Sequence, residues 1–244
     1  MNVVSSSPVR FSIFDWLDES GRGFAETYGE RLRLLEYADR AGFYCYHLAE
    51  HHGTSLSTTP SPTVFLSSVA QRTERLRIGA LSYLLPLYNP LRLLEELCML
   101  DHLSRGRLEL GISRGASPHE VQRMGVPYEE SRARFEEVLR LLVMGFTTGA
   151  LDFEGKYYQY RGLKTRFRPY QKPYPPMWYP TSNAESIPWV AAQGLNLVLA
   201  VRQWTKFERV CEGQALLEQA RALGQKAAAQ LEGKLGSRAG EPSP

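Results

Sequence analysis

The strongest constraint on the fold is the alternation of predicted β-strands and α-helices along residues 9–201. Six β-rich, apolar segments predict strands at residues 9–15, 43–48, 76–85, 107–113, 176–180 and 196–201. Helical spacing of apolar residues predicts helices between them, at residues 26–41, 62–72, 91–103, 128–147 and 185–193. Strands that alternate with helices in units of about 30 residues predict an α/β fold with a parallel sheet.

Two further segments depart from this alternation. Residues 151–170 are rich in Tyr, Gly and Arg and predict a small hairpin followed by a loop, which could serve as a lid. After Arg202 the composition changes: residues 207–233 are rich in Ala, Gln, Glu and Leu and predict a helix, and the chain closes on SRAGEPSP. We therefore expect a βα domain over residues 1–201 and a divergent helical and disordered tail over residues 202–244.

Charge and cysteine content exclude several function classes. The net charge is +3, and the basic residues are scattered except at Lys164, Arg166 and Arg168, which is too small a patch to predict nucleic-acid binding. The three cysteines lie far apart, which favours reduced thiols. No signal peptide and no apolar run of about 20 residues is found, so a cytoplasmic protein without a membrane segment is expected.

Polar side chains gather directly after the second predicted strand. Glu50, His51 and His52 follow the apolar residues 43–49 and precede Gly53. In βα-repeat proteins the carboxyl ends of the strands carry the chemistry. A histidine can donate and accept protons near neutral pH, which makes acid–base chemistry one interpretation of this cluster. The alternative is a hydrogen-bonded cluster that holds the loop.

A metal site is a third interpretation of the same cluster. A catalytic metal needs three or more ligands, usually from several strands. The other candidate histidines are His102, at the end of a helix and on the opposite side of the sheet, and His119. His47 lies in the middle of its strand, where a core position is more common than a ligand position. The sequence therefore does not favour a metal site.

Four motifs in order resemble the bacterial-luciferase-like flavin monooxygenases. They are AEHHG at residues 49–53, LPLYNPLR ending at Arg92, MLDHLSRGRLELGISRG at residues 99–115, and WYPTSNAESIPW at residues 178–189. The resemblance covers about residues 9–201 and implies a TIM-type (β/α)8 barrel in which about six βα units are recognisable. It also implies a monooxygenase that acts on paired donors with incorporation of O2.

The resemblance implies cofactors and partners as well. Relatives take reduced FMN from a separate flavin reductase, or use the deazaflavin F420, which we expect less here. The implied substrate is a small apolar organic molecule. The first helices of relatives pack in a dimer, so a homodimer is expected.

The resemblance assigns roles to individual positions. His51 matches the histidine that supports the oxygen chemistry of the flavin, and His52 and Glu50 complete the catalytic group. Arg114 matches the residue that reaches the flavin phosphate. The positions matched to cofactor binding are Leu81, Ser82, Arg114, Ala116, Ser182, Asn183 and Ser186, and many relatives carry a non-proline cis peptide at the Leu81–Ser82 position.

The physical chemistry of FMN agrees with the phosphate assignment. Ser182, Asn183 and Ser186 bracket a predicted helix start, where free N–H groups favour an anion. Arg114 can donate two parallel hydrogen bonds to phosphate, and Gly115 permits a close approach of the backbone. Taken singly, a helix cap and a surface arginine explain the same residues.

The chain departs from the family in one respect, because no segment predicts the seventh and eighth strands of the barrel. A parallel barrel without two strands exposes two edges. Three explanations remain open: a truncated gene product with an unrelated tail, a reduced relative that holds flavin without turnover, or a barrel whose gap is covered by residues 207–233. A non-catalytic, flavin-binding family member is therefore the alternative function.

Overall fold

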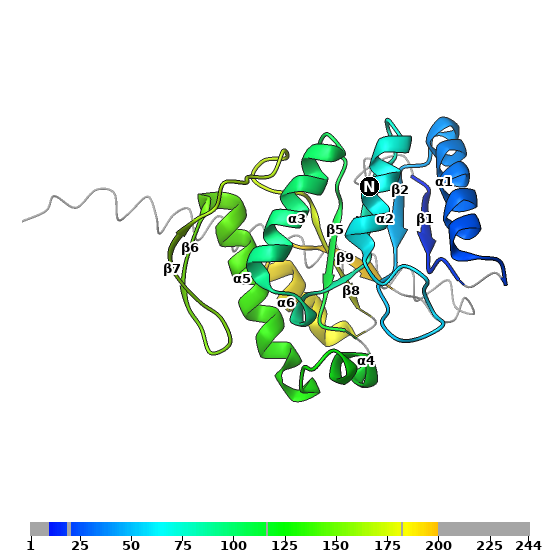
Figure 1. The fold of residues 1–244 in the computed structure, drawn as a ribbon. Helices are drawn as coiled ribbons and strands as arrows, with labels where there is room; N and C mark the ends of the chain where they lie inside the picture. Colours follow the sequence, from blue (N-terminus) through cyan, green and yellow to red (C-terminus); the bar gives the residue numbers. More distant parts are fainter. Residues whose placement is uncertain (1–9, 19–20, 116, 182, 200–244) are drawn as a thin grey trace, which may run out of the picture. The chain divides into compact units, whose positions relative to one another are not determined.

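The computed structural model describes residues 10–18, 21–115, 117–181 and 183–199 (Figure 1). The chain separates into two compact units, Met1–Pro176 and Met177–Pro244. The expected boundary at residues 201 and 202 and the expected tail lie outside the described residues.

The strands of the first unit are β1 (Ser12–Asp15), β2 (Cys45–Leu48), β3 (Arg77–Ala80), β4 (Tyr83–Leu84), β5 (Leu110–Ser113), β6 (Ala150–Glu154) and β7 (Gln159–Lys164). Its helices are α1 (Phe24–Ala41), α2 (Pro62–Arg72), α3 (Pro90–Leu103), α4 (Pro118–Arg123) and α5 (Ser131–Thr148), with short 3-10 turns η1 (Leu85–Leu87) and η2 (Tyr128–Glu130).

The first unit is built on parallel strands joined by helices, which confirms the α/β prediction. β1 pairs with β2 and β2 with β3, both in parallel, while β4 pairs in parallel with β5. A parallel bridge between Ile78 and Leu108 joins β3 to the segment that leads into β5. Glu109 N donates to Ile78 O over 2.8 Å, so these two strands lie side by side.

Helix ends follow the local signals in the sequence. Gly42 follows α1 with φ of 83°, and its N–H is bonded back to the last turn of the helix. This left-handed conformation has little cost for glycine, which explains where α1 ends. α2 covers the predicted residues 62–72, with Pro62 in its first turn.

Apolar helix faces cover the strands and form the core. α1 packs against α2, α2 against β3 and α3, and α3 against α5, as Figure 1 shows for the first unit. Three apolar residues of α5 at helical spacing, Phe135, Val138 and Leu142, are buried. On the solvent-exposed side of α5, Arg132 Nε donates to Glu136 Oε1 over 2.8 Å, a pair of charged residues at i and i+4.

The third predicted strand is not continuous, so the prediction of one strand over residues 76–85 was wrong. It divides into β3 and β4 at a cis peptide bond between Leu81 and Ser82, and a 3-10 turn begins at Leu85. The cis bond lies at the position that the resemblance implied. Propensity within an apolar run cannot mark such a break, because both halves satisfy the strand pattern.

Two local features differ from the sequence prediction. Residues 118–123 form α4, which was not predicted, and the strand predicted over residues 107–113 has its ladder only at Leu110–Ser113. The long helix predicted from residue 128 begins with the 3-10 turn η2 before α5 starts at Ser131. Helix ends often tighten in this way.

The predicted hairpin is present as the antiparallel pair β6–β7. The turn of the hairpin is attached to α5 by Glu137. This side chain is buried, although glutamate is normally exposed. The Glu137 carboxylate accepts hydrogen bonds from the amides of Lys156 (2.8 Å), Tyr157 (3.0 Å) and Tyr158 (3.2 Å). Three amide donors compensate the desolvation of one carboxylate.

The second unit contributes two parallel strands and a short helix to the described residues. β8 (Met177–Thr181) pairs in parallel with β9 (Asn196–Leu199). Between them lie the 3-10 turn η3 (Ala184–Ser186) and α6 (Ile187–Ala192). The unit therefore has the predicted strand–helix–strand order, with a shorter helix than the 185–193 expected.

Two expectations about residue classes can be placed in the structure. Cys45 and Cys98 are free, buried thiols, while Cys211 lies outside the described residues. Within the part of the chain that the structure describes, no helix combines the length and apolar character needed to cross a membrane.

Candidate active site at the strand carboxyl ends

The candidate residues of the first unit all follow strand carboxyl ends. Glu50, His51 and His52 come just after β2, Leu81 and Ser82 just after β3, and Arg114 just after β5. Because these strands are parallel neighbours, their carboxyl ends meet at one edge of the sheet. The topology therefore brings these residues to one edge of the sheet.

Glu50 is the buried centre of this edge, with 3% of its surface exposed. Its Oε2 accepts hydrogen bonds from Tyr88 Oη over 2.8 Å and from the Leu84 amide over 3.2 Å. Its Oε1 lies 2.8 Å from His52 Nε2. Glu50 thus joins the loop after β2 to the segment after β4.

The environment of Glu50 and His52 favours the protonated form of each side chain. Burial raises the pKa of Glu50, and the hydrogen bond to Glu50 is the main cause that raises the pKa of His52. Burial also holds the pKa of Tyr88 well above its ordinary value, so its hydroxyl stays a donor to Glu50. This geometry makes Glu50 an orienting group for His52.

His51 has different partners from the histidine beside it. Its Nδ1 lies 3.1 Å from Glu120 Oε1 and 3.2 Å from Glu120 Oε2, and 24% of the side chain is exposed. Glu120 belongs to α4, the helix that was not predicted. The adjacent histidines therefore separate: His52 points to Glu50 in the interior, and His51 points to α4.

Glu120 and α4 were not predicted, although the sequence contains a helix-start signal at residues 117–120. Residues 117–120 read Ser-Pro-His-Glu, which combines a helix-capping serine, a proline in the first turn and a glutamate three residues after the cap. In the structure Ser117 Oγ accepts a hydrogen bond from the Glu120 amide over 3.4 Å. That pattern would have placed a short helix here, but not the histidine that Glu120 contacts.

The turn after β3 places Leu81 and Ser82 beside the same edge. The Leu81 amide donates to Leu48 O over 2.8 Å, which ties the turn to the end of β2. Ser82 is buried. Both candidates are therefore close along the sheet to the residues that follow β2.

Arg114 is held by an aromatic residue that the sequence reasoning did not single out. Its Nη2 donates to Tyr128 Oη over 3.0 Å, and its guanidinium carbon lies 5.1 Å from the centre of the Tyr128 ring. Gly115 has φ of 92°, and a Cβ there would meet Val121 Cγ2 at 3.1 Å. Ala116 lies outside the described residues.

The phosphate candidates of the second unit are placed only in part. Ser182 lies outside the described residues. Asn183 is exposed, and its Oδ1 accepts from the Glu185 amide over 3.0 Å, which makes it a turn former. Ser186 precedes α6 and makes no side-chain capping bond.

Two tyrosines near this edge have different partners. Tyr83 is fully buried, and its Oη lies 3.2 Å from Thr63 Oγ1, so it belongs to the core. The Tyr88 hydroxyl donates a hydrogen bond to Glu50. The Tyr88 carbonyl accepts a hydrogen bond from Tyr158 Oη of the hairpin over 3.5 Å. The hairpin thus reaches a residue of the site.

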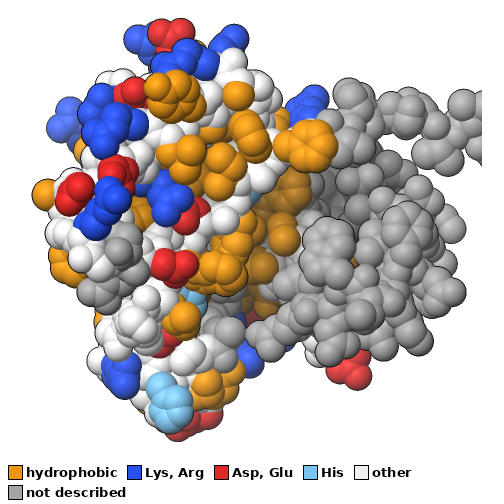
Figure 2. Space-filling view, turned by 90° about the vertical axis from the view of Figure 1, so that its right-hand side faces the viewer, with side chains coloured by type: hydrophobic (Ala, Val, Ile, Leu, Met, Phe, Trp, Pro, Cys, Tyr) orange, Lys and Arg blue, Asp and Glu red, His pale blue; other side chains and the backbone are white. Residues whose placement is uncertain are grey.

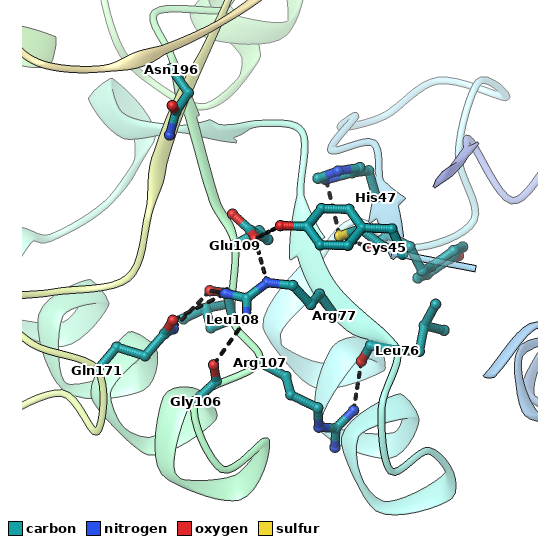
Figure 3. Close-up of polar contacts among 12 residues, drawn as sticks. Cys45, His47, Leu76, Arg77, Gly106, Arg107, Leu108, Glu109, Gln171 and Asn196 are labelled. Carbon is teal, nitrogen blue, oxygen red and sulfur yellow. Dashed lines mark hydrogen bonds and ion pairs between the residues drawn. The ribbon is translucent and has the colours of Figure 1, made fainter. Parts of the chain in front are cut away.

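A second buried polar network lies at the amino ends of the strands and is separate from this edge (Figure 3). Glu109 forms an ion pair with Arg77 and accepts from Tyr44 Oη over 3.1 Å. Arg77 also donates to Gln171 Oε1 over 3.0 Å. Strand amino ends in βα folds contribute mainly to stability, so we assign this network to the fold.

Histidines outside the cluster do not form a metal centre in the described part of the chain. His102 Nε2 lies 3.0 Å from Arg168 O, and burial lowers the pKa of His47 in β2. The described residues contain no group of three or more His, Cys, Asp and Glu side chains placed to hold a metal ion.

Comparison with known proteins finds relatives of this chain. An uncharacterized protein of Sinorhizobium fredii is 46% identical over 81% of this chain and 58% of its own length. The oxygenase component of the flavin-dependent trigonelline monooxygenase of Acinetobacter baylyi is 28% identical over 78% of this chain and 53% of its own length. The chain spans about half the length of the curated relatives it matches.

Solved structures share the fold. A monooxygenase from Streptomyces bottropensis superposes with a TM-score of 0.81 at 27% identity, covering 90% of this chain and 67% of that one. The oxygenating constituent of 3,6-diketocamphane monooxygenase from Pseudomonas putida, in complex with FMN, gives 0.74 at 18% identity, covering 91% and 62%. An F420-dependent secondary alcohol dehydrogenase gives 0.69 at 16% identity, covering 90% and 64%.

The family assignment follows from the sequence match itself. The sequence pattern of the luciferase-like monooxygenases matches residues 9–231, which is most of the 244 residues. Members of this family are flavin-dependent monooxygenases, and related structures use FMN or F420. The chain belongs to the luciferase-like monooxygenase family.

Proposed function

We propose that this chain is the oxygenase component of a two-component monooxygenase, which uses reduced FMN and O2 to oxidise a small apolar organic substrate. The observation that carries the proposal is the edge of the first unit, where His51, the Glu50–His52 pair and Arg114 follow neighbouring parallel strands. A separate flavin reductase supplies the reduced FMN. The protein acts in the cytoplasm as a homodimer.

The residues fit the chemistry of FMN. The flavin tail is a dianion, and Arg114 offers a guanidinium of which one Nη is held by Tyr128. Gly115 adopts a left-handed conformation with no side chain in the way of a ligand. Ser182, Asn183 and Ser186 supply the remaining phosphate contacts, and Leu81 and Ser82 support the ring. The phosphate dianion favours FMN over F420 at these positions.

Each site residue has a distinct part in the reaction. Bound reduced FMN supplies the electrons that activate O2, and the protein supplies position and exclusion of water. His51 donates and accepts the proton at the reacting oxygen through its imidazole. Glu50 orients His52 and holds the loop through Tyr88, so these three form the support for His51.

The alternative is a family member that binds flavin without turnover. Binding residues near β2 and β5 could be retained while substrate binding is lost. The two functions share FMN binding and differ in oxygen consumption.

The test measures binding and turnover separately, on the full chain. FMN fluorescence and anaerobic calorimetry with reduced FMN should give dissociation constants in the micromolar range, about −8 kcal/mol. With a flavin reductase, NADH and a panel of small apolar substrates, oxygen uptake should be coupled to oxygenated product. Failure to bind either redox form would contradict both functions, and binding without product formation would favour the alternative.

His51→Ala separates the catalytic role from binding. We expect product formation to fall at least about 100-fold, the lower range for loss of a general acid–base group. FMN affinity should stay within about threefold, because His51 is not among the proposed phosphate contacts. A large loss of FMN affinity would show that His51 binds the cofactor instead.

A further inference from the structure

Glu120 contacts His51 in a way that the proposed roles do not yet use. The residue is buried, with 4% of its surface exposed, and both carboxylate oxygens approach the same imidazole nitrogen. The distances from His51 Nδ1 are 3.1 Å to Oε1 and 3.2 Å to Oε2. Burial of a carboxylate without a hydrogen-bond partner is costly. The contact with the His51 imidazole compensates part of that cost for Glu120.

The contact selects one tautomer of His51. An ionised carboxylate can only accept hydrogen bonds, so the imidazole must donate through Nδ1. In the neutral ring the other nitrogen, Nε2, then carries the lone pair. Part of the side chain is exposed, at 24%, which leaves the ring open to a ligand. Glu120 therefore decides which nitrogen of His51 can accept a proton.

The helix that carries Glu120 is fixed at two further points. Ser117 Oγ accepts from the Glu120 amide at the start of α4, and Val121 in its middle is fully buried. Arg123 Nη1 donates to Gly53 O over 2.7 Å. Gly53 closes the same loop that contains His51, so α4 holds this loop both through the imidazole and through the backbone.

His52 provides an internal comparison. Its Nε2 is occupied by Glu50 at 2.8 Å, whereas the nitrogen of His51 that is occupied is Nδ1. The two neighbouring rings are thus anchored through opposite nitrogens. Of the two rings, His51 is the one whose contact with a carboxylate is made by Nδ1 and not by Nε2, and that carboxylate belongs to Glu120.

We propose that Glu120 is a positioning residue that holds His51 as the Nδ1–H tautomer and aims its Nε2 at the reacting atoms. This inference rests on the proposed function in so far as His51 is the acid–base group. A glutamate on a short helix, 69 positions along the chain from His51, thereby sets the direction of proton transfer.

The tautomer can be measured in the full-length protein without flavin. The chain has five histidines, so long-range ¹H–¹⁵N spectra of ¹⁵N-histidine-labelled protein resolve few signals. His51→Gln assigns the His51 signal by its disappearance. At about pH 9, where imidazoles are neutral, we expect the Nδ1–H pattern for His51 in the wild type. An Nε2–H pattern in the wild type overturns the proposal without any Glu120 variant.

Substitution of Glu120 tests the cause. Glu120→Gln keeps the size of the side chain but can donate as well as accept, so both His51 tautomers should become populated. Glu120→Ala should remove the preference for Nδ1–H. Glu129→Gln, an exposed residue of η2, is the matched control and should leave the pattern unchanged. Persistence of pure Nδ1–H in both Glu120 variants overturns the assignment.

Turnover supplies the second measurement. In Glu120→Gln we expect kcat to fall about tenfold or more, with FMN affinity and KM changed less than threefold, the pattern of an interaction used in the transition state. An unchanged kcat overturns the positioning role. Because the tautomer is measured without flavin, failure of wild-type FMN binding would refute the proposed function and leave the Glu120–His51 result standing.

Discussion

At the scale of residues, the site depends on how three neighbouring side chains are divided between two environments. Glu50 faces the interior and is hydrogen-bonded by His52, Tyr88 and the Leu84 amide. His51 turns outward to Glu120. The sequence AEHHG identifies the cluster, but one-residue steps after a strand send side chains to opposite sides. That division anchors His52 through Nε2 and His51 through Nδ1.

The Glu50–His52 pair gives stability a specific pH dependence. The pKa of His52 is raised by Glu50 and that of Glu50 by burial, so the folded state binds protons more tightly than the unfolded state at both groups. Stability from His52 is then complete below its unfolded pKa of 6.5 and is lost as the pH rises through the raised value. The Glu50 contribution has the same sign, with the loss beginning above 4.5.

Glu50→Gln tests this dependence. We expect the variant to be less stable by about 1–3 kcal/mol at pH 6, the range for hydrogen bonds to charged groups. Its unfolding free energy should also fall less steeply between pH 6 and pH 8.5 than that of the wild type, because His52 loses the partner that raises its pKa. Urea unfolding at several pH values measures both. Parallel slopes would contradict the pairing, and Glu136→Gln, at an exposed ion pair, serves as the control.

At the scale of elements, close approach of the strands explains two glycines in the ladder. A Cβ on Gly79 of β3 would lie 2.0 Å from Glu109 O, and one on Gly111 of β5 would lie 2.3 Å from Ala80 O. Both positions need glycine because β3 and β5 lie against each other where the bridge at Ile78 forms. This packing fixes the spacing of the strand ends that carry the site.

Gly79→Ala should therefore be strongly destabilising. The new methyl group meets backbone rather than a mobile side chain, so the strands must separate, and we expect a loss of about 3 kcal/mol or more in unfolding free energy. Gly29→Ala in α1 is the matched control, since its Cβ would meet nothing closer than Arg33 Nη1 at 3.8 Å. That change should stabilise by about 0.5–1 kcal/mol. Similar denaturation midpoints for both variants would contradict the packing argument.

The helix α4 and the β6–β7 hairpin show how connections reach the site. α4 brings Glu120 to His51, while the hairpin, fixed by Glu137 to α5, brings Tyr158 to the carbonyl of Tyr88. The role of the hairpin as a lid stays a prediction. Its attachment to α5 through three amides of its turn makes the turn a fixed part of the first unit.

At the scale of the whole molecule, β1 is an end strand among the described strands of the first unit. β1 pairs only with β2 among the described strands, and Phe14 and Trp16 on and after β1 are 46% and 45% exposed. Figure 2 shows this side of the molecule, where hydrophobic side chains lie between charged ones. Whether the barrel has unpaired edges stays a prediction, because the expected tail lies outside the described residues.

The proposed contact between Arg114 and the flavin phosphate can be tested in the full chain. Arg114 belongs to the first unit. Arg114→Ala should weaken FMN binding about 10- to 100-fold, equivalent to about 1.4–2.7 kcal/mol, while riboflavin, which lacks the phosphate, should change less than threefold. Ser186→Ala should weaken FMN binding by a smaller factor, and it should also affect FMN more than riboflavin. Equal losses for FMN and riboflavin would show that Arg114 does not bind the phosphate.

Arg132→Ala is the control for general effects of charge. Arg132 lies on the exposed face of α5 in an ion pair with Glu136. Surface ion pairs contribute little, so neither FMN nor riboflavin affinity should change. A loss of FMN affinity in this variant would indicate non-specific attraction of the anion instead of a phosphate site.

The sequence by itself determined the alternation of strands and helices, the parallel pairing, most helix ends and the residues at the strand carboxyl ends. These follow from local signals: apolar periodicity, Gly42, Pro62 and the polar cluster after β2. Resemblance added the family and the cis peptide after Leu81. Such features are predictable because the information for each lies within a few neighbouring residues.

Only the tertiary structure decided the partners. Glu120 meets His51 across 69 residues and Tyr88 meets Glu50 across 38, distances along the chain that no local pattern encodes. It also showed that Tyr83 is core, that Glu137 is a buried acceptor for the hairpin, and that β3 and β4 are separate strands. The physical reason is that burial and hydrogen-bond partners are set by packing between distant segments, and these contacts determine what each site residue can do.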